Sequence, residues 1–269
     1  MVGTIKFAFD PVKLKDLARE RHEAYVNATP FPHIVFDNFF SEEILGRVCE
    51  EFPKPGEVNW TLRYHDNSKK LEFNSETQLG EFAWRLITQL NSSTFITFLE
   101  KLTGINGLIP DPHLWGGGLH QIERGGYLNV HADFNWHEKL KLDRRLNLLL
   151  YLNKDWKEEY GGCLELWDRN MSRCEKKLLP LFNRCVIFNT TDYSYHGHPI
   201  PLTCPEGLTR KSLALYYYSN GRPAEEISKP HSTLYQRKNS KRPSLLNFFA
   251  AMTRRQKGSK EVSGGPSGG

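Results

Sequence analysis

From residue 115 onward the chain is a succession of short apolar segments separated by glycine, proline and asparagine, and this pattern constrains the fold most. The segments are 117–125, 127–133, 146–153, 163–168, 185–191, 198–203 and 211–219. Many short strands with frequent turn signals are typical of a sandwich or a closed barrel. Two of them, LNLLLYLN and LALYYY, do not alternate cleanly between polar and apolar residues, so we expect central strands covered on both faces.

The residues before this region carry helical patterns that can provide such a cover. Helices are predicted over residues 11–27, over 41–52 and, as a pair, within 75–103. Pro11 suits a first helical turn, Ser41 is a good N-cap, and Gly104 ends the last helix. A strand is predicted over 31–40, and the polar segment 54–74 is predicted to be a loop. Together these elements predict an α+β, mainly β fold with a cupin-like jelly-roll core and helices packed on one face.

The composition is that of an ordinary globular protein, with 39% hydrophobic and 25% charged residues. No run of 18 apolar residues occurs, so no transmembrane segment is expected. The first residues lack the apolar core of a secretory signal. The five cysteines are scattered and contain no C-x-x-C pair, which favours a reducing, cytoplasmic location over a disulfide framework.

Positive charge is concentrated near the C-terminus. Residues 227–269 contain nine Lys or Arg and one acidic residue, Glu261, whereas the rest of the chain is mildly acidic. An apolar run, 244–252, lies within this segment and is followed by Arg254 and Arg255. Three interpretations stay open for the basic tail: a docked C-terminal helix, contact with RNA or another polyanion, and adsorption to an anionic membrane.

His131 and Asp133 form an H-x-D pair in the segment 127–133. Two residues apart on a strand, their side chains project to the same side because side chains alternate with period 2. A distal histidine, His196, can join them if the sheet folds back. Two imidazoles and one carboxylate on one face of a metal leave other positions open, as in non-heme Fe(II) oxygenases. An isolated H-x-D is weak evidence, and the surrounding segments carry the rest.

Four segments give this motif a specific context: YLNVHADFN, YLNKDWKEEYGGCLELWD, RCVIFNTTDYSYHGH and TRKSLALYYYS. They resemble the 2-oxoglutarate- and Fe(II)-dependent oxygenases, and within them the prolyl 4-hydroxylase-like branch. The opening FPHIVFDNFFSEE is similar to the entry strand and helix of that branch. The resemblance covers about residues 31–220 and implies a double-stranded β-helix with iron at its mouth.

The resemblance implies a set of metal ligands. His131 and Asp133 match the H-x-D of the family, and SYHGHP provides the distal histidine. In the family, the distal histidine comes directly after a serine and an aromatic residue. His196 comes directly after Ser-Tyr and so matches this position. His198 also points inward on the same strand, and alternation does not separate the two. We therefore take His196 as the distal ligand and keep His198 as the alternative, with a role in orienting a ligand or co-substrate if it does not bind metal.

The resemblance also implies a pocket for the co-substrate. Arg210 lies where the family places the basic anchor of the distal carboxylate, and a planar guanidinium can hold a carboxylate with two hydrogen bonds. Tyr151 matches a position whose hydroxyl reaches the same carboxylate. Tyr127 is a weaker candidate for this pocket, and simple packing explains it equally well. The implied cofactors are Fe(II), 2-oxoglutarate and O2, with ascorbate as a further candidate.

The implied activity is hydroxylation of an unactivated C–H bond, coupled to oxidative decarboxylation of 2-oxoglutarate to succinate. The branch favours a prolyl residue of a protein or peptide as the substrate. A small molecule such as an amino acid, a sugar or a natural-product intermediate is the alternative, since a fold does not fix a substrate. A non-catalytic cupin-like binding protein with a basic tail is a third hypothesis. The expected organisation is an N-terminal helix in 1–30, an oxygenase domain in 31–222 with its jelly-roll core in 115–220, and a tail in 223–269.

Overall fold

The computed structural model of the chain describes residues 6–235, and these form one compact unit. The predicted helix at 244–252 and the other basic-tail residues from 236 onward lie outside the described residues. Within 6–235, no helix has the length and apolar character needed to cross a bilayer.

Four α-helices precede the main strands: α1 (Pro11–Val26), α2 (Glu42–Glu50), α3 (Glu81–Leu90) and α4 (Ser93–Thr103). Their ends follow the expected local chemistry. The Asp10 carboxylate accepts hydrogen bonds from the first turn of α1, the Ser92 hydroxyl caps α4, and Gly104 ends α4 in the left-handed conformation. The helices predicted over 11–27, 41–52 and 75–103 are thus confirmed.

The strands form a single antiparallel sheet. They are β1 (His33–Asp37), β2 (Thr61–His65), β3 (Ser68–Phe73), β4 (Ile109–Pro110), β5 (Gly118–Ile122), β6 (Tyr127–Ala132), β7 (Trp136–His137), β8 (Leu142–Tyr151), β9 (Leu164–Trp167), β10 (Cys174–Leu178), β11 (Arg184–Asn189), β12 (His196–His198), β13 (Arg210–Ser219) and β14 (Leu234–Tyr235). Their main order is β1-β11-β8-β13-β5-β3-β6-β12-β9-β10. The sheet curls, which confirms the predicted jelly-roll class.

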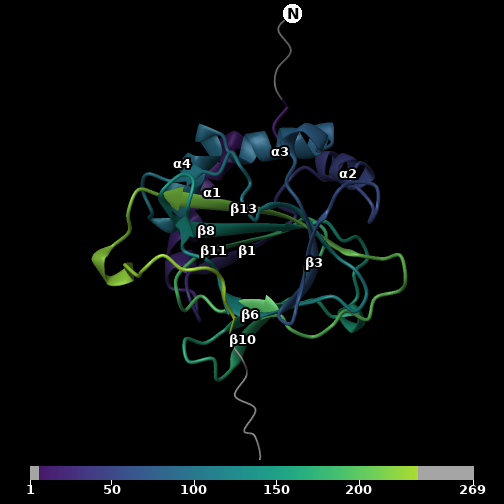
Figure 1. Ribbon diagram of the computed structural model, residues 1–269. Coiled ribbons are helices and arrows are strands. Elements are labelled where there is room, and N and C mark those ends of the chain that lie inside the picture. Colours follow the sequence, from purple (N-terminus) through teal and green to yellow (C-terminus); the bar gives the residue numbers. More distant parts are fainter. Residues whose placement is uncertain (1–5, 236–269) are drawn as a thin grey trace, which may run out of the picture. The chain divides into compact units, whose positions relative to one another are not determined.

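The helices cover one side of the curled sheet. Figure 1 shows α1–α4 over β13, β8, β11 and β1, with β6 and β10 on the opposite side and β3 running between the two. Strand alternation separates two environments on β8 and β13. Leu148 and Leu215 pack into the helix-covered core, whereas Tyr151, Arg210 and Tyr216 line the interior of the curl. The two runs predicted to be central strands are therefore central, and one of their faces carries the candidate site.

The segment 54–74, predicted as a loop, instead contains the hairpin of β2 and β3, and this prediction was wrong. All five residues of β2 are exposed, so its sequence has no buried face to give an alternating pattern. β3 joins the two sides of the curl because it pairs with both β5 and β6. The strand predicted over 198–203 was also misplaced, since the strand β12 ends at His198.

The compact unit continues beyond residue 222, where the sequence placed the start of the tail. Residues 220–235, here called the strap, leave the end of β13 and return along the sheet. The strap ends in β14, which pairs with β6 through Leu234 opposite Ala132 and Tyr235 opposite His131. Its final strand therefore lies directly beside one of the candidate metal ligands.

We expect Gly118→Ala to lower the free energy of unfolding by about 3 kcal/mol, as strain at a left-handed residue and overpacking add. Gly118 has a φ of +92°, and an added Cβ would collide with the carbonyl oxygen of Phe73, where β3 meets β5. Gly125→Ala is the control, because Gly125 has a φ of +75° but open space around it. It should cost only about 1 kcal/mol. Urea unfolding of both variants measures the difference, and equal losses would contradict a tight β3–β5 contact.

Candidate active site

Three side chains converge at the mouth of the curled sheet: His131, Asp133 and His196. One ligand atom from each lies within 4.8 Å of the others, and no other group of three or more His, Cys, Asp or Glu side chains within residues 6–235 does so. All three residues are buried. The structure thus brings together the two histidines and the carboxylate that the sequence singled out, and it leaves His198 outside this cluster.

Backbone hydrogen bonds orient both imidazoles. His131 Nδ1 lies 2.8 Å from the carbonyl oxygen of Asn129, and His196 Nδ1 lies 2.9 Å from that of Ser194. A carbonyl oxygen can only accept a hydrogen bond, so Nδ1 carries the proton in each ring. The Nε2 atoms therefore keep their lone pairs, and they lie 3.5 and 3.4 Å from the Asp133 carboxylate. This is the arrangement that a divalent metal requires of histidine ligands.

Asp133 is held in its charged form by its neighbours. Burial acts to raise the pKa of the carboxyl, but the Arg144 guanidinium and the two imidazoles outweigh it and hold the pKa well below its usual value. Arg144 Nη2 donates to Oδ2 at 3.0 Å, and Asn147 Nδ2 donates to the same oxygen at 2.6 Å. These two hydrogen bonds fix the orientation of the Asp133 carboxylate.

His196 is neutral at physiological pH. Burial lowers the pKa of its imidazole to about 4, although the nearby Asp133 carboxylate acts in the opposite direction. A neutral imidazole offers a lone pair to a metal without first losing a proton. Two imidazole nitrogens and one carboxylate fit Fe(II) with coordination positions left open.

A bulge explains which residues of β6 reach the site. His196 pairs with His131 and His198 pairs with Leu128, so three residues on β12 oppose four on β6. The extra residue shifts the alternation, and Leu128 rather than Tyr127 lines the interior. The Tyr127 hydroxyl instead points toward the carbonyl oxygen of Asp66, at 3.5 Å. The structure therefore does not bring Tyr127 into the predicted co-substrate pocket.

Arg210 and Tyr151 lie together in a pocket behind the candidate metal ligands. Arg210 Nη2 donates to the Tyr151 hydroxyl at 3.3 Å, and Arg210 Nε donates to the carbonyl oxygen of Gly162 at 2.8 Å. Gly162 has a φ of +73°, and a Cβ there would approach Arg210 Cδ to 2.9 Å. The glycine pair in EEYGGC thus allows the close approach that positions the guanidinium. Burial raises the pKa of Tyr151, so its hydroxyl stays protonated.

The charge of Arg210 has no protein counterpart. Its side chain is buried, and no carboxylate among the described residues forms an ion pair with it. A buried cation without an opposite charge is costly, so this pocket favours an anionic ligand. Iron with the co-substrate 2-oxoglutarate fits this arrangement: His131, Asp133 and His196 would hold the metal, and Arg210 and Tyr151 would hold a carboxylate.

A larger cavity of about 590 Å³ opens on the other side of His131 and Asp133. Its walls come from distant parts of the chain, among them Arg63 of β2, Trp115, Tyr216 of β13 and Tyr235 of β14. The Tyr235 ring centroid lies 5.4 Å from that of His131. This volume lies in the usual range of ligand sites, and its position makes it the candidate substrate cavity.

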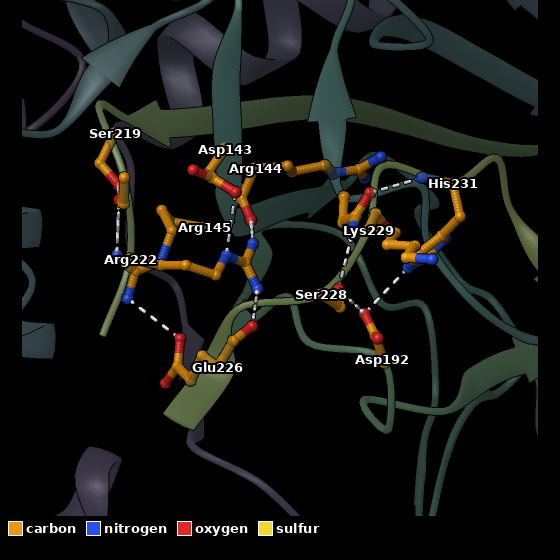
Figure 2. A network of polar contacts seen from close by, with 12 residues as sticks. Asp143, Arg144, Arg145, Asp192, Ser219, Arg222, Glu226, Ser228, Lys229 and His231 are labelled. Carbon is orange, nitrogen blue, oxygen red and sulfur yellow. Dashed lines mark hydrogen bonds and ion pairs between the residues drawn. The ribbon is translucent and has the colours of Figure 1, made fainter. Parts of the chain in front are cut away.

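The strap forms one wall of this cavity. It is held by polar contacts, which Figure 2 shows. Asp192 Oδ1 accepts from the Ser228 hydroxyl at 3.1 Å and lies 2.9 Å from His231 Nε2. Asn135 donates to Ser228 at 2.8 Å and accepts from the backbone N–H of His231 at 2.9 Å. Asn135 follows Asp133, and Asp192 precedes His196, so the strap joins the two loops that flank the candidate metal ligands.

Two ion pairs hold the first part of the strap. Arg222 Nε lies 3.2 Å from Asp143 Oδ1, and its Nη2 donates to the carbonyl oxygen of Arg144 at 2.6 Å. Arg145 Nη2 lies 3.3 Å from Glu226 Oε2. Figure 2 shows these contacts beside those of Asp192. Polar side-chain contacts thus hold both the first and the second half of the strap against the rest of the domain.

Sequence reasoning missed several residues of the site. Arg144 and Asn147 support Asp133, Lys70 lines both cavities, and Tyr235 covers His131. A charged pair at the start of an apolar strand was a usable signal for Arg144, because a buried strand rarely begins with two arginines. Lys70 gave no signal, since it lay in a segment read as a loop.

A curled antiparallel sheet with two histidines and one carboxylate at its mouth, and an unpaired arginine behind them, defines the class of iron oxygenases that use a 2-oxo acid. Residues 117–218 match the family model of the 2OG-Fe(II) oxygenase superfamily. The resemblance predicted from the sequence is therefore confirmed.

Individual relatives agree with this assignment. The chain is 25% identical over 205 residues to the prolyl 3-hydroxylase OGFOD1 of Mus musculus, and the match covers 73% of this chain and 34% of that protein. The chain thus spans about a third of the length of this curated relative.

Solved structures show the same fold at low sequence identity. A prolyl hydroxylase from Trichoplax adhaerens, in complex with a peptide of the hypoxia inducible factor oxygen degradation domain, is 18% identical with a TM-score of 0.52, covering 77% of this chain and 91% of its own. HygX from Streptomyces hygroscopicus, with nickel, 2-oxoglutarate and hygromycin B bound, is 11% identical with a TM-score of 0.52, covering 81% and 97%.

Proposed function

We propose that the protein is an Fe(II)- and 2-oxoglutarate-dependent hydroxylase that acts on a prolyl residue of a protein or peptide. The observation that carries the oxygenase chemistry is the cluster of His131, Asp133 and His196 beside a pocket with the unpaired Arg210. The prolyl substrate is supported by the relative, which is a prolyl 3-hydroxylase, and by the wide cavity next to the cluster.

Each residue of the site has a defined task in this proposal. Bound Fe(II), 2-oxoglutarate and O2 supply the oxidation, in which 2-oxoglutarate becomes succinate and CO2 and one oxygen atom enters a C–H bond. His131, Asp133 and His196 hold the metal, while Asn147 keeps one oxygen of Asp133 fixed by hydrogen bonding. Arg210 holds the far carboxylate of the co-substrate.

A small-molecule substrate is the second candidate. The structurally similar HygX was solved with hygromycin B bound, so this fold accommodates a small molecule at such a site. The cavity of about 590 Å³ also lies within the range of small-molecule pockets. A non-catalytic binding protein is the third candidate, and it predicts no turnover of 2-oxoglutarate.

Mass spectrometry of cells with and without the protein separates these candidates. A prolyl hydroxylase should add one oxygen atom to a prolyl residue of at least one peptide, and cells carrying only His131→Ala should lack that modification. An unchanged proteome with an altered metabolite would favour the small-molecule substrate. If purified, iron-loaded protein released no succinate from 2-oxoglutarate with any cell extract, the enzyme proposal itself would be wrong.

The proposal includes three further elements from the sequence. A reducing, cytoplasmic location is supported by the scattered cysteines, all five of which are free thiols. Ascorbate is proposed as a reductant that restores iron after uncoupled turnover. The basic tail, residues 227–269, is proposed to contact a polyanion or an anionic membrane, and its charge is the only support for this.

A further inference from the structure

His198 is buried with no hydrogen-bonding partner on either ring nitrogen. Its relative exposure is 4%, and neither Nδ1 nor Nε2 has a partner among the described residues. Buried polar groups in folded proteins are nearly always paired, and an unpaired one calls for an explanation. A valine or leucine would fill this position without that cost, so packing alone does not account for a histidine here.

The other histidines around the same pocket are paired. His131 and His196 each have Nδ1 against a backbone carbonyl, and His120 Nε2 lies 3.1 Å from the carbonyl oxygen of Gly116. All of them line the pocket that contains Arg210, as His198 does. Among the pocket histidines that the structure describes, His198 alone has both ring nitrogens available to a ligand.

The surroundings of His198 select an anionic ligand. Two positively charged side chains, Arg210 and Lys70, line the same pocket as His198. The Lys70 charge is matched by Glu72 at 2.6 Å, whereas that of Arg210 is matched by no carboxylate in residues 6–235. An imidazole carries at least one N–H in either of its protonation states, so His198 can donate to a carboxylate oxygen whichever state it adopts.

We infer that His198 is a co-substrate-binding residue that donates a hydrogen bond to the carboxylate of 2-oxoglutarate that Arg210 and Tyr151 also hold. This inference rests on the proposed function and adds a third donor to the carboxylate pocket. It also assigns the second histidine of YHGHP a role separate from that of His196, which belongs to the metal cluster.

Calorimetric titration of the Mn(II)-loaded protein tests this assignment. We expect His198→Val to weaken 2-oxoglutarate binding about tenfold, the effect of losing one hydrogen bond to a charged group. Binding of 2-oxopentanoate, which lacks the distal carboxylate, should be nearly the same in the variant and the wild type. Mn(II) affinity should be unchanged. Equal weakening for both 2-oxo acids, or unchanged 2-oxoglutarate binding, would overturn the assignment, and so would a loss of Mn(II).

A second measurement separates ligand binding from a structural role. His198→Val removes two unpaired buried nitrogens, so the ligand-free variant should unfold at the same or a higher temperature than the wild type. A lower unfolding temperature would mean that His198 supports the fold and would overturn the assignment. His198→Asn keeps an N–H donor and should retain more 2-oxoglutarate affinity than His198→Val. If the wild type itself bound no 2-oxoglutarate, the proposed function would fail rather than this assignment alone.

Discussion

His131→Ala and Asp133→Ala are each expected to lose Fe(II) binding and to release no succinate from 2-oxoglutarate. Each removes one of three clustered donors, and changes in the outer partners of metal ligands alone already cost about 10–100-fold in affinity or activity. The loss from a ligand itself should therefore exceed about 100-fold. Fe(II) titration under anaerobic conditions and a succinate assay measure the two effects. Succinate release that survived both substitutions would show that the metal assignment is wrong.

Matched controls are available on the surface of the same domain. Asp66, in the turn between β2 and β3, and His113 are exposed and belong to no metal cluster, so Asp66→Ala and His113→Ala should bind Fe(II) as the wild type does. His196→Ala should lose iron, whereas His198→Ala should keep it. The reverse order would exchange the roles of these two histidines.

Arg210→Ala is expected to weaken 2-oxoglutarate binding by about two to three orders of magnitude while Fe(II) stays bound. Breaking a buried charge pair costs about 3–5 kcal/mol, much of it because the remaining charge is left unpaired. Calorimetric titration with 2-oxoglutarate gives the affinity, and Fe(II) titration gives the control.

Arg210→Lys refines this test. A lysine keeps the positive charge but not the planar fork, and it cannot reproduce the contacts of Arg210 with Gly162 and Tyr151 together. Its affinity should lie between those of the wild type and Arg210→Ala. An unchanged KM for 2-oxoglutarate in Arg210→Ala would place the carboxylate anchor elsewhere.

The parts of the fold that the sequence predicted are those with a buried face. α3 and α4 carry apolar stripes, and β8 and β13 are nearly continuous apolar runs, so their burial is visible in the residues themselves. β2 has no buried residue, and the short β14 contributes two residues. Such strands form because they pair with another strand, and the local sequence does not show which strand that is.

The candidate site was predictable where a motif coincided with strand alternation. His131 and Asp133 were found in this way, and Arg210 and Tyr151 meet as the resemblance implied. Tyr127 was misplaced because one extra residue in β6 reverses the alternation, and a bulge depends on pairing with β12. Arg144 and Tyr235 reach the site through contacts between segments that are distant in sequence.

Because of the strap, the candidate metal site and one wall of the candidate substrate cavity come from different parts of the chain. The candidate metal ligands and Arg210 lie on strands of the curled sheet or directly beside them, whereas one wall of the candidate substrate cavity comes from a segment that pairs with the sheet only through the two residues of β14. Its other attachments are side-chain contacts such as those of Asp192 and Arg222. A segment attached in this way can change in length and composition without altering the strand order. Substrate range can therefore diverge between homologues, or be re-engineered, while the oxidative chemistry is inherited unchanged.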